Sequence, residues 1–210
     1  MHILLVAATA PEIAPLLADR RAGVDVLITG VGMVATAAHC SRALSTSRYD
    51  LALNVGVCGS FDRALAPGTV VHVTSDRLAE LGAEDDERFL TIHELQLLGE
   101  NEFPFERGVL VNRNPPENSA IAALPAVSAI TVSTAHGNTA SIARVVERFR
   151  PQVESMEGAA FMYACLIHQV PFAQVRAVSN VVEKRNRAAW KMAEAIEALN
   201  GTARRIIGGP

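Results

Sequence analysis

The chain has 210 residues, half of them hydrophobic, and a formal net charge of −3. This length and hydrophobic content indicate a single domain over residues 1–210 with a sizeable buried core. The weak negative charge leaves no basic surface of the kind that binds nucleic acid or an anionic membrane, so neither is expected as a partner.

The cysteines and histidines are dispersed along the chain. Cys40, Cys58 and Cys165 show no C-x-x-C spacing, and the six histidines form no His-x-His or His-x-x-x-His pair. This pattern predicts a reduced, cytoplasmic protein without a bound metal. Residues 1–10 end like a signal peptide but lack a basic leader, so they are interpreted as a first strand. No apolar run reaches the roughly 20 residues of a membrane span.

Segments with strand and helix patterns alternate along most of the chain. Strands are predicted over residues 3–8, 24–29, 51–57, 69–74, 127–133 and 172–179, and helices over residues 11–20, 32–44, 138–149, 158–168 and 187–199. The strands are apolar throughout rather than alternating, which is typical of a sheet buried on both faces. We therefore predict an α/β fold of three layers, α/β/α, with a mainly parallel central sheet.

One region does not follow the alternation of strand and helix patterns. Residues 76–118 are rich in acidic side chains and contain Pro104, Pro115 and Pro116. They are interpreted as a surface excursion with short helical or strand pieces, and not as a second domain.

The octet Glu154–Phe161 joins an extended run to an apolar helix. It places Met156 and Glu157 at the carboxyl end of a strand, where open α/β sheets build their sites. A carboxylate there is stabilised by the unpaired backbone N–H groups of the helix start. It can accept two hydrogen bonds side by side, as from the 2′ and 3′ hydroxyls of a ribose. On this octet alone, a Glu157 that only caps the helix is an equally good interpretation.

Two glycine-containing turns follow the second and third predicted strands. Gly30–Ala35 matches the loose dinucleotide pattern G-x-G-x-x-A, but it follows the second strand, and Asp50 is badly placed to bind a ribose. It is interpreted as a turn around Gly32 whose backbone N–H groups face a small ligand, or as a plain turn. Gly56–Gly59 offers a second backbone turn with apolar side chains, and Ser60 is its only neighbour suited to a phosphate.

Three further polar residues lie near strand ends: Glu12, His136 and Asn180. Glu12 and Glu157 in one crevice can take separate roles, one as ligand for a sugar and one as general base for water. His136 and Asn180 could contact a ligand, whereas a solvated loop histidine and a turn asparagine are the plainer alternatives.

Taken together, these residues resemble the nucleoside phosphorylase and nucleosidase superfamily. The resemblance covers nearly the whole chain and is carried by Glu12, Gly30-x-Gly32, Gly56-x-x-Gly59, Glu154-Ser-Met-Glu-Gly-Ala-Ala and Arg176-Ala-Val-Ser-Asn180. Within the superfamily the chain looks most like the futalosine hydrolases, through residues 79–85, 178–183 and 185–190.

The resemblance implies a role for each matching position. Glu157 would hold the ribose hydroxyls, Met156 would pack against the ribose, and Glu12 would position and deprotonate the attacking water. Asn180 would face the purine, together with the backbone of residues 135–136. The positions expected to bind substrate are Gly32, Val57, Cys58, Gly59, Ala135, His136, Ser155, Met156 and Ser179.

Asn180 also bears on which purine is bound. Methylthioadenosine-type nucleosidases carry Asp at this position. A 6-amino group is a donor and suits a carboxylate, whereas a 6-oxo group is an acceptor and suits the NH₂ of Asn. Leaving a buried acceptor unpaired costs about 1–3 kcal/mol, roughly ten- to hundredfold in discrimination. Because Asn cannot give up a proton, the leaving base would be stabilised by hydrogen bonds or protonated from solvent.

The resemblance implies an N-ribosyl hydrolase that cleaves futalosine to hypoxanthine and dehypoxanthine futalosine, in menaquinone biosynthesis, with water and without a cofactor. Val57 stands where many relatives carry a polar side chain for the nucleophile, which favours hydrolysis over phosphorolysis. A purine nucleoside phosphorylase, a methylthioadenosine-type nucleosidase and a non-catalytic nucleoside-binding domain remain as alternatives.

Two further expectations concern the substrate's far end and the assembly. The benzoate-like anion on the 5′ side needs a cation, for which Arg77, Lys184, Arg185 and Arg187 are candidates. By analogy with relatives we expect a homo-oligomer, in which the apolar face of the excursion covers a neighbour.

Overall fold

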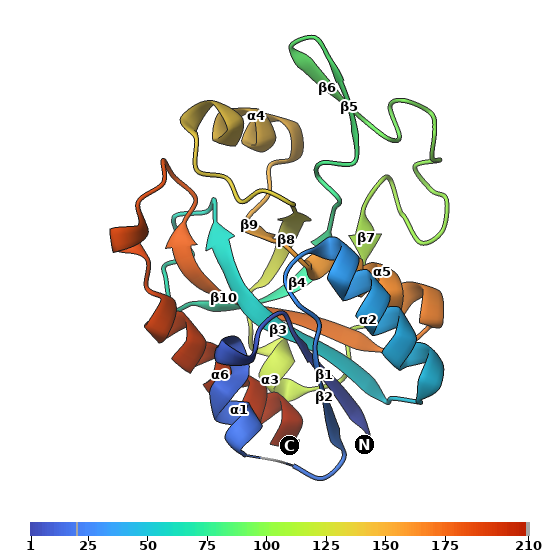
Figure 1. Cartoon of the computed structure of the whole chain (residues 1–210), viewed down its shortest axis with the longest axis vertical. Helices are drawn as coiled ribbons and strands as arrows, with labels where there is room; N and C mark the ends of the chain where they lie inside the picture. The colour runs from blue at the N-terminus through green and yellow to red at the C-terminus, as the bar shows by residue number, and fades with distance from the viewer. Residues whose placement is uncertain (20, 209–210) are drawn as a thin grey trace.

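The fold is built around one large mixed sheet, and the computed structural model describes residues 1–19 and 21–208 of the chain. The strands of this sheet are β1 (Ile3–Ala7), β2 (Val24–Ile28), β3 (Leu51–Ser60), β4 (Val70–Asp76), β7 (Leu110–Val111), β8 (Ala126–Thr131), β9 (Val153–Ser155) and β10 (Phe172–Val181). They run in the order β10-β4-β8-β9-β3-β1-β2, with β7 on β4 (Figure 1).

The sheet is mixed, so the prediction of a mainly parallel sheet is not confirmed. Among the described residues, five strand pairs of this sheet are parallel and three are antiparallel. The link between β3 and β4, residues 61–69, is too short for a helical crossover, and β4 runs antiparallel to β10. An apolar strand sequence indicates that both faces of the strand are buried, but it does not indicate whether the strand runs parallel or antiparallel to its neighbours.

The sheet is also partly closed, and this closure brings the site together. β10 pairs with both β3 and β4, so the path through β4, β8, β9 and β3 returns to β10. β9 pairs with β3 only at the far end of that strand, where Glu154 lies opposite Gly59. The end of β9 therefore meets the carboxyl ends of β3 and β10, although β9 runs antiparallel to β3.

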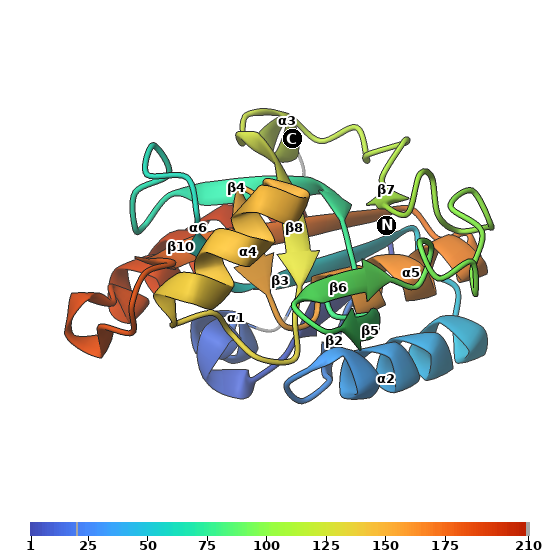
Figure 2. The ribbon, with the colours of Figure 1, turned by 90° about the horizontal axis from the view of Figure 1, so that it is seen from above.

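Helices cover both faces of the sheet, as predicted. α2 (Met33–Thr46) and α5 (Gly158–His168) pack together on one face. On the other face, α6 (Met192–Gly208) packs against β10 and β3 and contacts α1 (Ala14–Ala18) and α3 (Ser119–Ala122) (Figure 1, Figure 2). α4 (Thr139–Phe149) follows β8 and buries Val145 against Ile130 and Val132.

Two predicted helices differ from the observed ones. The first begins as a 3₁₀ turn, η1 (Ala10–Ile13), and continues as α1 to Ala18, while Arg20 lies outside the described residues. The last prediction, residues 187–199, contains a 3₁₀ turn, η2 (Arg187–Ala189), before α6 begins at Met192. Trp190 is extended, with ψ near 133°, which separates the two pieces.

The region predicted as an excursion carries the strands β5 (Gly82–Asp85) and β6 (Arg88–Thr91), which form a separate hairpin that projects from the body (Figure 1). Its first residue, Asp76, is an exception, because it is fully buried at the end of β4. None of the helices in the described parts of the chain combines the length and the apolar character that crossing a membrane requires.

Candidate active site

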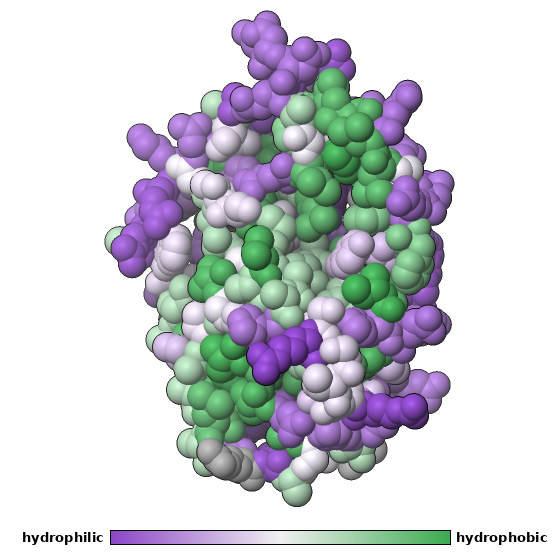
Figure 3. All heavy atoms as spheres, turned by 45° about the vertical axis from the view of Figure 1, so that its right-hand side comes forward, coloured by the Kyte–Doolittle hydropathy of each residue, from purple (hydrophilic) through white to green (hydrophobic). Residues whose placement is uncertain are grey.

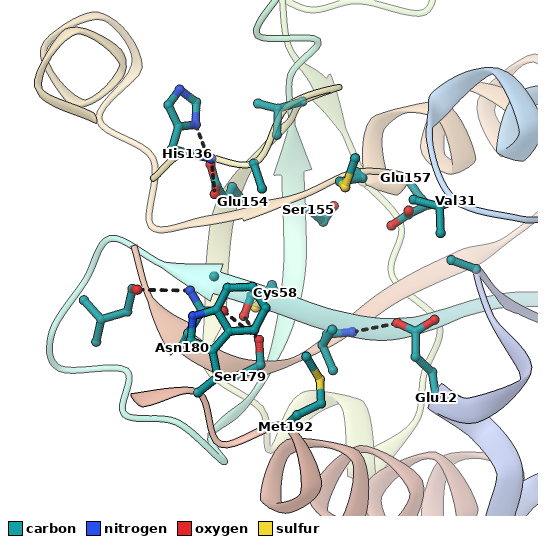
Figure 4. A pocket seen from close by; sticks show the side chains of 18 of the residues that line it. Glu12, Val31, Cys58, His136, Glu154, Ser155, Glu157, Ser179, Asn180 and Met192 are labelled. Atoms are coloured by element: carbon teal, nitrogen blue, oxygen red, sulfur yellow. Dashed lines mark hydrogen bonds and ion pairs between the residues drawn. The ribbon is translucent and has the colours of Figure 1, made fainter. Parts of the chain in front are cut away.

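A cavity of about 380 Å³ opens where the ends of β1, β3, β9 and β10 meet (Figure 4). It gathers residues from across the sequence, and eleven of the twelve predicted site residues line it. These are Glu12, Val57, Cys58, Gly59, Ala135, His136, Ser155, Met156, Glu157, Ser179 and Asn180. Gly32 does not line the cavity, but its backbone N–H donates to Glu157 Oε1 at 3.1 Å.

Glu157 stands at the start of α5 and is 7 % exposed. Its side chain makes no capping hydrogen bond, because other groups occupy the first amides of the helix. Ser155 Oγ accepts from Gly158 N at 3.2 Å, and Thr131 Oγ1 accepts from Ala159 N at 2.7 Å. The interpretation of Glu157 as a mere helix cap is therefore wrong, and its carboxylate keeps free acceptor positions at the cavity.

Glu12 is held in place from two sides. Its Oε2 accepts from Thr9 N at 2.9 Å and from Thr9 Oγ1 at 2.8 Å, which ties the carboxylate to the end of β1. Its Oε1 accepts from Val57 N on β3 at 3.3 Å. A carboxylate fixed by three donors is oriented before any ligand arrives.

Arg176 lies beneath both carboxylates and is only 1 % exposed. Its Nη1 is 4.0 Å from Glu157 Oε2. A Cβ on Gly56 would lie 2.2 Å from Nη1 and 3.1 Å from Glu12 Oε1, which shows how near the guanidinium comes to the second acid. Its Nη2 donates to Asn54 Oδ1, whereas Nε and Nη1 have no hydrogen-bond partner among the described residues. The guanidinium therefore places a fixed positive charge close to both carboxylates.

Asn180 and Ser179 end β10 on another wall of the cavity. Ser179 Oγ lies within hydrogen-bond reach of Asn180 Oδ1, at 2.9 Å, and of the Cys58 carbonyl, at 3.1 Å. Asn180 Nδ2 donates to the Val181 carbonyl at 3.0 Å and keeps a second N–H. Burial raises the pKa of the Cys58 thiol to about 12, so this side chain contributes an uncharged wall rather than a nucleophile.

Several residues that line the cavity had no role predicted from the sequence, and Glu154 is the most buried polar one among them. Glu154 binds both the ring and the backbone of His136, with Oε2 2.6 Å from Nδ1 and Oε1 3.0 Å from the backbone N. Arg176 does not line the cavity, and its position near the two acids could not be predicted because a charged residue in a buried strand gives no sign of what it contacts. The other lining residues without a predicted role are Ala8, Thr9, Pro11, Val31, Val132, Val181, Glu183, Asn186, Trp190, Met192 and Ile196.

Of the four cations considered for the 5′ anion, Arg185 is the one that lines the cavity within the described residues. Its guanidinium carbon lies 5.5 Å from the centre of the Trp190 ring. Its backbone N–H donates to the Gly137 carbonyl at 3.0 Å, which ties this segment to the loop of His136. Arg77 instead borders a separate small hollow near Phe105.

Comparison with known proteins identifies relatives in sequence. Residues 20–208 match the model of the phosphorylase superfamily. A futalosine hydrolase of Streptomyces coelicolor is 34 % identical over 188 residues, covering 84 % of this chain and 75 % of the relative. A futalosine hydrolase of Thermus thermophilus is 29 % identical over 189 residues, covering 88 % and 81 %.

Solved structures share the fold at lower identity. A 5′-methylthioadenosine/S-adenosylhomocysteine nucleosidase of Neisseria meningitidis, in complex with methylthio-immucillin-A, has a TM-score of 0.80 at 16 % identity and covers 98 % of both chains. The futalosine hydrolase of Helicobacter pylori has a TM-score of 0.79 at 14 % identity, with 99 % of this chain and 97 % of that chain covered. At these identities the similarity establishes the fold.

Proposed function

Because this chain belongs to the phosphorylase superfamily, and to the futalosine hydrolase family within it, we propose that it hydrolyses the N-glycosidic bond of futalosine. The products are hypoxanthine and dehypoxanthine futalosine, and the reaction belongs to menaquinone biosynthesis. The observation that carries this proposal is the pair of carboxylates, Glu12 and Glu157, that share one cavity above the buried Arg176.

Glu157 holds the ribose in this reaction. Its Oε1 is oriented by Gly32 N, and its remaining lone pairs accept from the 2′ and 3′ hydroxyls. Met156 lies beside it in the cavity wall and packs against the sugar. Holding the diol fixes the anomeric carbon relative to the Glu12 carboxylate. This positioning of the reacting groups is how substrate binding raises the rate.

Glu12 activates the water. As the bond between C1′ and the purine nitrogen breaks, its electron pair goes to the base, the water oxygen bonds to C1′, and the water proton passes to Glu12. The three donors from Thr9 and Val57 keep the carboxylate oriented toward the water, and the positive charge of Arg176 lies nearby. The departing base takes up its proton from solvent, because Asn180 has none to give.

Asn180 and Arg185 bind the two outer parts of the substrate. The second N–H of Asn180 donates to the 6-oxo group of the purine. Arg185, at the cavity and above Trp190, meets the carboxylate of the 5′ substituent. A guanidinium suits that group because it can bind a carboxylate through two parallel hydrogen bonds.

Incubation of the pure protein with futalosine tests the function. We expect release of hypoxanthine, followed by chromatography, at the same rate in phosphate-free buffer and with phosphate added. Glu157→Gln should lower the rate, since it weakens the hold on the diol. Release that requires phosphate would identify a phosphorylase instead, and no release under either condition would refute the proposal.

A homo-oligomer forms through the apolar face around the start of α2. Val34 is 86 % exposed and Val31 58 % exposed, and a shallow apolar hollow beside Val34 is lined by Leu78, Leu81 and Tyr163. Figure 3 shows hydrophobic side chains gathered on the side of the molecule that carries α2. Because Val31 also lines the cavity, a second copy on this face would adjoin the site. Val34→Lys should lower the mass measured by light scattering.

A further inference from the structure

We propose that Glu154 makes the site selective for 6-oxopurines over 6-aminopurines, by accepting a hydrogen bond from N1–H of the base. This inference rests on the proposed function and adds a residue that recognises the purine. His136 acts on Glu154 as a positioning residue and holds its carboxylate in place.

The position of Glu154 supports this role. The residue is 5 % exposed and lines the cavity from β9. A Cβ on Gly59 would lie 3.4 Å from Asn180 Nδ2 and 3.5 Å from Glu154 Cγ, so both side chains approach the same bare stretch of β3. Figure 4 shows Glu154 and Asn180 on opposite sides of one end of the cavity, with Glu12 and Glu157 at the other end. The base therefore lies between Glu154 and Asn180 when the sugar lies at the two acids.

Glu154 is fixed and still has acceptor capacity. Each of its oxygens binds one group of His136, the ring Nδ1 at 2.6 Å and the backbone N at 3.0 Å. A carboxylate offers about four lone-pair positions, so two remain for a ligand. The backbone N–H of His136, a donor that could otherwise meet the base, is consumed by the same contact. On this side of the cavity the base therefore meets a hydrogen-bond acceptor, the Glu154 carboxylate, and not a donor, the backbone N–H of His136.

The two purine classes differ at this edge. A 6-oxopurine presents an acceptor, O6, beside a donor, N1–H, whereas a 6-aminopurine presents a donor beside an acceptor, N1. Asn180 discriminates less strictly than a carboxylate, because its carboxamide can exchange donor and acceptor by half a turn if it gives up the hydrogen bond to the Val181 carbonyl. A carboxylate cannot make this exchange. An ionised Glu154 would face the N1 lone pair of a 6-aminopurine with no proton between them, which is unfavourable.

The test replaces Glu154 by Gln, which has the same shape and can turn either an acceptor or a donor to the base. We measure kcat/KM for futalosine and for aminofutalosine, its 6-amino analogue, in the wild type and in Glu154→Gln. The wild type should prefer futalosine. In the variant the preference should fall about ten- to hundredfold, since Gln can still accept from N1–H of futalosine and can now also donate to N1 of aminofutalosine.

Two control variants separate recognition from structure. Glu12→Gln should lower the rates for both substrates by the same factor, because both need the activated water. Glu154→Asp keeps an acceptor and should keep the preference for the 6-oxo substrate even where its rate falls. An equal loss for both substrates in Glu154→Gln would mean that Glu154 only holds the loop of His136, and the inference would be overturned.

Binding of the free bases gives the same comparison without turnover. Calorimetric titration with hypoxanthine and with adenine should show a wild-type preference for hypoxanthine that Glu154→Gln reduces. Binding of the free bases does not depend on whether futalosine is the substrate. If the protein cleaves no futalosine but binds hypoxanthine better than adenine, the proposed function fails while the role of Glu154 stands. A wild type that binds adenine at least as tightly as hypoxanthine would refute the role of Glu154.

Discussion

Gly56 shows how one missing side chain controls the site. A Cβ at this position would lie 2.2 Å from Arg176 Nη1, and Arg176 cannot retreat easily because it is 1 % exposed and bound to Asn54. Gly56→Ala should therefore displace the guanidinium from Glu12 and Glu157. We expect a loss of about 1–3 kcal/mol in the free energy of unfolding, as for other overpacked cores, and a lower kcat.

Urea unfolding and steady-state kinetics measure these two effects. Gly201→Ala on α6 is the matched control, because the nearest atom to its new Cβ is 4.0 Å away. That substitution should leave the protein as stable or more stable, since alanine favours a helix by up to about 1 kcal/mol. Equal stability and kcat in Gly56→Ala and the wild type would refute the placement of Arg176.

At the same scale, the sequence predicted those site residues that stand beside strand ends. Glu12 follows the apolar strand β1 and Glu157 follows the short buried strand β9, so the edge where they lie can be inferred from position alone. Glu154 and Arg176 lie within strands, and their surroundings come from segments far away in the chain. Arg176 meets Asn54, 122 residues earlier, and no local pattern predicts that contact.

The start of α5 depends on a hydroxyl from a different strand. Thr131 on β8 accepts from Ala159 N at 2.7 Å and donates to Asp76 Oδ1 at 3.0 Å, and it is fully buried. Thr131→Val keeps the shape but leaves a buried N–H and a buried carboxylate without this partner. We expect a loss of about 1–3 kcal/mol in the free energy of unfolding, measured with urea.

The control for this substitution is Thr139→Val, at the exposed start of α4. It should change the free energy of unfolding by less than about 0.5 kcal/mol. A matching small effect in Thr131→Val would show that α5 does not need the cap from β8. Because Glu157 directly precedes this helix, Thr131→Val should also lower the rate of futalosine cleavage by loosening the carboxylate.

The positions of the helices and strands could be predicted from the sequence better than the relative directions of the paired strands. The prediction for α5 matches its observed bounds, and most of its nearly all-apolar run is buried. The prediction of a mainly parallel sheet is not confirmed, because parallel and antiparallel strands that are buried on both faces have the same apolar pattern. The partial closure depends on β10 pairing with both β3 and β4, which is a property of the whole chain.

At the scale of the molecule, a buried polar network beneath the site makes stability depend on pH. Asp76 is fully buried, accepts from Arg77 N and Thr131 Oγ1, and accepts from Gln174 Nε2 at 2.9 Å. Burial raises its pKa from 3.8 to about 7, and this effect outweighs the backbone and Thr131 hydrogen bonds and the nearby charge of Arg176.

The sign of the effect follows from which state binds the proton more tightly. Between about pH 4 and pH 7 the folded protein keeps a proton on Asp76 that the unfolded chain has lost, so the free energy of unfolding falls as the pH rises. The slope is at most about 1.4 kcal/mol per pH unit. Asp76→Asn cannot titrate, so its stability relative to the wild type should improve steadily over this window and stay constant above it.

Urea unfolding of both proteins at several pH values from 4 to 8 measures this difference. Asp85→Asn, which removes an exposed carboxylate on β5, controls for the change in net charge. Parallel pH profiles for the wild type and Asp76→Asn would show that Asp76 stays ionised in the folded protein. A stability of Asp76→Asn that rises relative to the wild type between pH 4 and pH 7 would mean that the network joining β4, β8 and β10 carries a proton at pH 5 and stabilises the fold most in mildly acidic solution.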